Sequence, residues 1–88
     1  MVDVTRQNII DAVNKIISLE ENHREDRFPK IEKISIDIIR SINACGFLVS
    51  KDDWILYQFL DDYDIRLKDK KYAAYQTEAV LKRISESS

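Results

Sequence analysis

The sequence contains a single glycine, a single proline and a single cysteine among its 88 residues. One cysteine excludes a disulfide framework, a CxxC redox centre and a zinc site built on two or four cysteines. One glycine, Gly46, excludes the glycine-rich loops that cradle phosphates. The scarcity of both helix-breaking residues also argues against a fold built from many short strands and turns.

Long apolar runs are also missing. No stretch approaches the ~20 apolar residues that a membrane span needs. The first residues lack the basic and apolar regions of a signal peptide. We therefore expect a cytoplasmic protein with no membrane association.

The remaining composition is that of one small domain, with 44% hydrophobic residues, 34% charged residues and a net charge of −2. A chain of this size buries only ~60–65% of its unfolded surface, so a partner subunit would add useful stability. No repeat or linker is visible, and we expect residues 1–88 to form a single helical domain.

The only proline and glycine bracket one helix. Between Pro29 and Gly46, apolar residues recur at steps of three and four, which places them on one helical face. We predict a helix over residues 29–45, with Asp26 as its cap and Gly46 in the left-handed position after its end. The segment Ile34–Ile38 also alternates like a strand, but the helical period extends further.

Three more helices are predicted from the same periodicity, at about residues 4–21, 51–65 and 69–86. Ser50 can cap the third by accepting a hydrogen bond from the backbone N–H of Asp53. A break is expected between residues 64 and 70, and one long bent helix is the alternative. The fold class is therefore all-α, a small four-helix bundle or a pair of helical hairpins. Its inward stripes are Ile9, Ile10, Val13, Ile16 and Ile17, then Ile31, Ile34, Ile38, Ile42 and Cys45, then Leu56, Phe59, Leu60, Tyr63 and Leu67, and finally Ala73, Thr77, Val80, Leu81 and Ile84.

Residues outside these stripes suggest a binding surface. Between residues 47 and 65 there are five aspartates against one lysine, interleaved with aromatic residues. Acidic groups attract a basic partner over long range, and Trp and Tyr supply short-range binding energy. The alternative is that the acids are helix N-terminal charges or pair with Arg66, Lys68, Lys70 and Lys71. The predicted partner-binding residues are Trp54, Tyr57, Asp61, Asp62 and Asp64.

A second set of off-stripe residues predicts self-association. Large apolar groups outside a core usually mark an interface, although they can also close an irregular bundle. We expect Ile36, Ile39, Tyr72 and Tyr75 to form a homo-oligomer interface, which could enclose a small ligand.

No residue pattern indicates catalysis or a metal site. Asp61 and Asp64 share a helix face, but nothing marks a pocket around them. His23 lies in a polar stretch, and Cys45, the only cysteine, belongs to an apolar stripe. We expect a protein that is not an enzyme and that has no cofactor and no metal.

The segment after residue 43 also permits a helix-turn-helix interpretation, with small Ala44, turn-forming Gly46 and Ser50 opening a second helix. That helix begins with paired aspartates, which repel phosphate. The basic clusters around Lys70 and Lys33 keep a DNA-binding regulator as an alternative, although the acidic composition argues against nucleic acid.

In size, acidity, helical content and acidic-aromatic surface, the chain resembles small bacterial immunity proteins and phage-encoded inhibitors in general build. This resemblance implies an inhibitor or an immunity or anti-defence accessory protein that binds another protein. We therefore expect a small acidic helical protein that binds a basic partner protein through the helix after Ser50. The alternatives are a DNA-binding regulator and a homo-oligomer that binds a small ligand between its subunits.

Overall fold

A computed structural model describes residues 4–21 and 24–86, and for residues 24 and 25 it describes the backbone alone. In this part of the chain all regular structure is helical, which confirms the all-α fold class. The helices are α1 (Arg6–Glu20), α2 (Arg24–Cys45), α3 (Trp54–Asp61), α4 (Tyr63–Lys68) and α5 (Lys70–Glu86), and a 3₁₀ turn, η1 (Lys51–Asp53), leads into α3.

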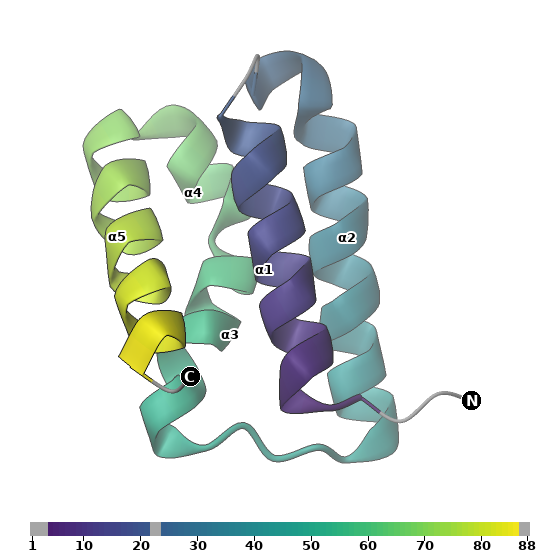
Figure 1. Ribbon diagram of the computed structural model, residues 1–88. Coiled ribbons are helices and arrows are strands. Elements are labelled where there is room, and N and C mark those ends of the chain that lie inside the picture. Colours follow the sequence, from purple (N-terminus) through teal and green to yellow (C-terminus); the bar gives the residue numbers. More distant parts are fainter. Residues whose placement is uncertain (1–3, 22–23, 87–88) are drawn as a thin grey trace.

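The helices run in alternating directions (Figure 1). Helices α1 and α2 form one antiparallel pair, α3 and α4 together return along the molecule, and α5 runs back beside them. The core lies between these rods and contains mainly Ile, Leu and Val side chains. Its buried apolar residues are Val4, Ile9, Ile10, Val13, Ile16, Ile17, Ile31, Ile42, Leu56, Phe59, Leu60 and Val80.

Local hydrogen bonds define several helix ends where the sequence predicts them. Thr5 caps α1 in a capping box, in which its hydroxyl and the Asn8 side chain each accept from the other's backbone N–H, at 3.2 and 2.8 Å. Gly46 has φ +70°, and the N–H of Phe47 donates to the carbonyl of Ile42, as expected for a glycine-terminated helix. The Ser50 hydroxyl accepts from the N–H of Asp53 at 3.2 Å, which confirms that cap.

The predicted start of the second helix is wrong. Helix α2 begins at Arg24, so Asp26 is not its cap, and Pro29 lies inside the helix. Pro29 is the sixth residue of α2, past the first turn, so it removes one i→i−4 backbone hydrogen bond that the packing of the helix must offset. The Phe28 ring packs against Tyr63 of α4 with centroids 5.8 Å apart, which gives the added turn a tertiary contact.

The prediction of a single helix over residues 51–65 is also wrong. This segment consists of η1, α3 and the first part of α4, with a bend at Asp62 (φ −94°, ψ 21°). The break expected between residues 64 and 70 is confirmed at Asp69, whose backbone is extended. One long helix is therefore excluded, and the bend turns α4 so that its residues face α2 on one side and α5 on the other.

One predicted inward residue is wrong. Leu81 is 45% exposed, because α1 and α5 are not closely packed and an open groove lies between them. The groove has a volume of about 450 Å³. The bundle is thus closed on three sides and open on the fourth.

In the described part of the chain, no helix is both long and apolar enough to cross a membrane.

Candidate functional site

An exposed aromatic pair lies on α3, in the segment that is rich in aspartate. Trp54 and Tyr57, one turn apart, stack with ring centroids 5.0 Å apart and an interplanar angle of 14°. Trp54 is 50% exposed, whereas Tyr57 is half-buried and packs against the core. Tyr57 therefore anchors the pair, and Trp54 presents its outer face to solvent.

Two acidic residues continue this surface. Asp61 is exposed and lies seven residues after Trp54, on the same helical face. Asp64 is exposed on α4, and its Oδ1 accepts from the N–H of Ile65 at 3.0 Å. Neither Asp61 nor Asp64 forms an ion pair with another described residue. These acids are therefore available to an external cation.

Tyr63 links this surface to α2. Burial raises the pKa of the Tyr63 phenol, and the nearby carboxylates of Glu32, Asp64 and Asp61 raise it further. Negative charge from α2, α3 and α4 thus converges around one phenol. We use the term α3 surface for the six residues Glu32, Trp54, Tyr57, Asp61, Tyr63 and Asp64.

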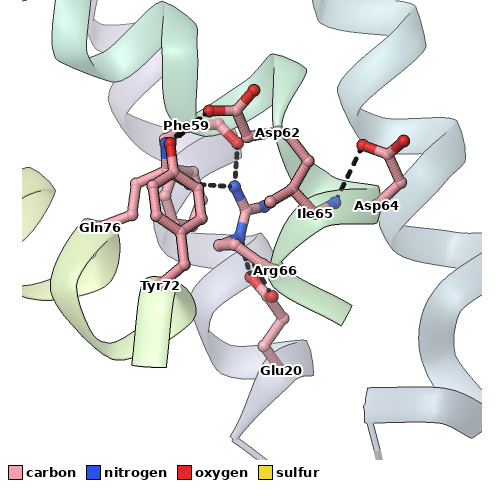
Figure 2. Close-up of polar contacts among 8 residues, drawn as sticks. All are labelled: Glu20, Phe59, Asp62, Asp64, Ile65, Arg66, Tyr72 and Gln76. Carbon is pink, nitrogen blue, oxygen red and sulfur yellow. Dashed lines mark hydrogen bonds and ion pairs between the residues drawn. The ribbon is translucent and has the colours of Figure 1, made fainter. Parts of the chain in front are cut away.

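Asp62 does not belong to this surface. Its Oδ2 accepts hydrogen bonds from the Tyr72 hydroxyl at 2.7 Å and from Gln76 Nε2 at 3.0 Å, so it holds α5. The hydrogen bond to Asp62 raises the pKa of Tyr72. Figure 2 shows the carboxylates of Asp62 and Asp64 on opposite sides of the chain. Of the five predicted partner-binding residues, Trp54, Tyr57 and Asp61 thus lie along α3, Asp64 lies near Tyr63 on α4, and Asp62 faces α5.

The residues predicted for an oligomer interface lie in two places. Ile36 and Ile39 are half-buried, four and seven residues after Glu32, so they share the side of α2 that borders the α3 surface. Tyr72 and Tyr75 lie on α5 with ring centroids 6.5 Å apart, and Tyr75 is exposed while Tyr72 is held by Asp62. These four residues therefore do not form one continuous patch.

The sequence interpretation missed a buried charge at Arg66, which is 0% exposed. Its Nε lies 3.1 and 3.2 Å from the two carboxylate oxygens of Glu20 on α1. Its Nη1 donates to Gln76 Oε1 at 2.8 Å and to the carbonyl of Phe59, and its guanidinium lies 3.7 Å above the Phe59 ring centre (Figure 2). The spacing of Arg66 in the sequence indicates this burial, because Arg66 lies seven residues after Phe59 and three after Tyr63, on the inward stripe.

This placement corrects the interpretation of Arg66 as a surface charge. It neither pairs with the exposed aspartates nor stands in a basic patch for DNA phosphates. The DNA-binding alternative depended in part on this residue, so its remaining support is the exposed lysines of the same segment and the basic cluster around Lys33.

A second polar cluster was also missed, around Asp53. Its carboxylate binds Arg6 of α1, with Nε–Oδ2 at 2.6 Å and Nη2–Oδ1 at 3.0 Å, and Arg83 Nε of α5 at 3.0 Å. The hydrogen bond from Arg6 is the main cause that lowers the pKa of Asp53 from 3.8 to about 2. Asp53 is therefore more than a helix N-terminal charge, because it links Arg6 of α1 and Arg83 of α5 to the start of α3.

No three His, Cys, Asp or Glu side chains gather to hold a metal ion in the described ranges. His23 lies outside them. Cys45 is half-buried, and its thiol contacts the carbonyl of Ile42 at 3.7 Å.

Comparisons with models of known protein families, with curated proteins and with solved structures gave no match for this chain.

Proposed function

We propose that this protein is a non-enzymatic helical binding protein, an inhibitor or immunity-type protein that engages a basic partner protein through the α3 surface. The observation that carries the proposal is the half-exposed Trp54, stacked on the anchored Tyr57, on the helical face that ends at the exposed Asp61. An exposed Trp ring that is already stacked on a neighbour has less side-chain entropy to lose on binding, and Trp is a frequent hot spot in interfaces.

Charge supports the same proposal. Asp61 and Asp64 are exposed and have no ion-pair partner within the described residues, and Glu32 adds a third carboxylate beside Tyr63. Such a cluster speeds encounter with a cationic surface and disfavours acidic partners. A basic partner whose Lys or Arg side chains flank an apolar contact fits this pattern.

The test compares two matched double variants. W54A/D61N removes one aromatic and one acidic side chain from the α3 surface. Its control, Y75A/D37N, removes an exposed aromatic and an exposed acid elsewhere. Each tagged protein is incubated with lysate of its native host, and the captured proteins are quantified by mass spectrometry at low and high salt.

We expect wild type and Y75A/D37N to capture equal amounts of a protein with a basic surface, and high salt to release it. W54A/D61N should capture at least about tenfold less of the same protein. Equal capture by W54A/D61N, with unchanged helicity, would contradict it.

A further inference from the structure

The groove between α1 and α5 is separate from the α3 surface, because its lining residues come only from these two helices. Its uncharged lining residues are Ile17 of α1 and Ala73, Ala74, Thr77 and Leu81 of α5. Along α5 the lining extends from Lys70 to Leu81, about three helical turns or roughly 16 Å, and along α1 it covers about one turn, from Ile17 to Glu21. The α5 side is thus long enough to lie along another helix.

Small side chains favour the same occupant. Ala73, Ala74 and Thr77 leave little side-chain volume above the α5 backbone, so another helix can approach closely. Leu81, nearly half exposed at one end, offers a larger apolar contact. An entering helix would restore the fourth seam of the bundle and cover Leu81.

The groove rim carries the charge that selects its occupant. Glu21 of α1 and Glu78 of α5 are exposed on the two sides, Lys70 is the one base among the lining residues, and Glu20 is held by Arg66. The negative end of the α1 dipole is offset at this place by Arg66, which binds Glu20, and by the positive end of α5, which begins at Lys70. The preference for a cationic side chain therefore rests on the exposed carboxylates of Glu21 and Glu78.

We propose that the α1–α5 groove binds an amphipathic helix of a partner protein, with apolar residues on one face and Lys or Arg residues flanking that face. The apolar face lies on Ala73, Thr77 and Leu81, and the flanking cations reach Glu21 and Glu78. This proposal does not depend on the α3 surface.

The probe is a synthetic helical peptide of leucine and lysine, with leucines at i, i+3, i+4 and i+7, titrated into the ¹⁵N-labelled full chain. A peptide with glutamate in place of lysine is the charge control. Binding is followed by amide chemical shifts, and sedimentation reports self-association.

Two variant pairs test shape and charge independently. A74W fills the groove. Its control, A44W, places the same side chain at an exposed position of α2. E21K/E78K reverses the rim charge, and D37K/E86K makes the same net change elsewhere. We expect A74W and E21K/E78K to weaken lysine-peptide binding at least about tenfold, with the two controls within about twofold of wild type.

The expected shift changes lie at Ile17, Ala73, Thr77 and Leu81, and W54A/D61N leaves them unchanged. Shifts centred on Trp54 and Asp61, equal binding of the glutamate peptide, or equal weakening by test and control variants would overturn the proposal. Dimerisation that A74W abolishes would also overturn it, because the occupant would then be a second copy of this chain.

Discussion

Four of the five aspartates between residues 52 and 64 form two groups that sequence alone does not distinguish. Asp53 and Asp62 face the other helices and bind Arg6, Arg83, Tyr72 and Gln76. Asp61, on the Trp54 face of α3, and Asp64, on α4, are exposed to solvent. Acidic groups with partners inside the fold contribute to stability. Exposed acids without ion pairs contribute little to stability, and the proposed external partner is the role that we assign to them.

Arg66 belongs with the inward-facing group, and its replacement is expected to cause the largest loss of stability. R66A leaves the Glu20 carboxylate and the Gln76 amide without their buried partner and removes the contact over Phe59. We expect a loss of about 3–5 kcal/mol in the free energy of unfolding, measured by urea denaturation. The exposed K68A variant, with a loss below about 0.5 kcal/mol, is the control.

A paired variant sharpens this prediction. R66M/E20Q removes both charges, so it should be more stable than R66A, because no uncompensated carboxylate remains. Equal stability of R66A and K68A would show that Arg66 is not buried in the folded protein.

The second-largest loss of stability is expected from replacing Asp53, and this loss depends on pH. Folding lowers the pKa of Asp53, so its contribution is complete above about pH 4 and is lost as the pH falls towards 2. The shift corresponds to at most about 2 kcal/mol, reduced by solvent screening. We expect D53N to be less stable than wild type at pH 6 by up to this amount.

Urea unfolding from pH 6 to pH 2 measures this difference. The gap between wild type and D53N should narrow between about pH 4 and pH 2. A gap that stays constant over this range would contradict the assigned cluster with Arg6 and Arg83.

The third effect is that of Asp62. D62A removes acceptors for Tyr72 and Gln76 at a half-buried position, and we expect a loss of about 1 kcal/mol in unfolding free energy. The pKa of Tyr72 should move back towards its ordinary value in D62A, because the hydrogen bond that raises it is gone. Ultraviolet titration of tyrosine in Y57F/Y63F/Y75F, with and without D62A, checks this shift. An unchanged titration would contradict the contact.

Much of the fold followed from periodicity and helix-end residues. Thr5, Gly46 and Ser50 act through hydrogen bonds within a few residues, so local sequence contains the necessary information. Pro29 misled because the helix continues through it despite the lost hydrogen bond, and the added turn packs through Phe28 against Tyr63, which is remote in sequence.

The candidate site was predictable only in part, for the same reason. Trp54, Tyr57 and Asp61 share one helical face, and spacing alone groups them. Asp62 and Asp64 differ by two residues, but a bend at Asp62 and partners on α5 send them to opposite sides. Arg66 was missed because its partner Glu20 lies on a helix that sequence cannot place beside it.

The smallest expected stability effect is that of the α3 surface, and it provides the most direct test of the central claim. The measurement is the affinity of W54A/D61N for the partner captured by wild type, with the unfolding free energy of the same sample determined in parallel. We predict stability within about 0.5 kcal/mol of wild type and binding weakened at least about tenfold. Undiminished binding by this stable variant would contradict the claim that the outward-facing acids and Trp54 form the binding surface.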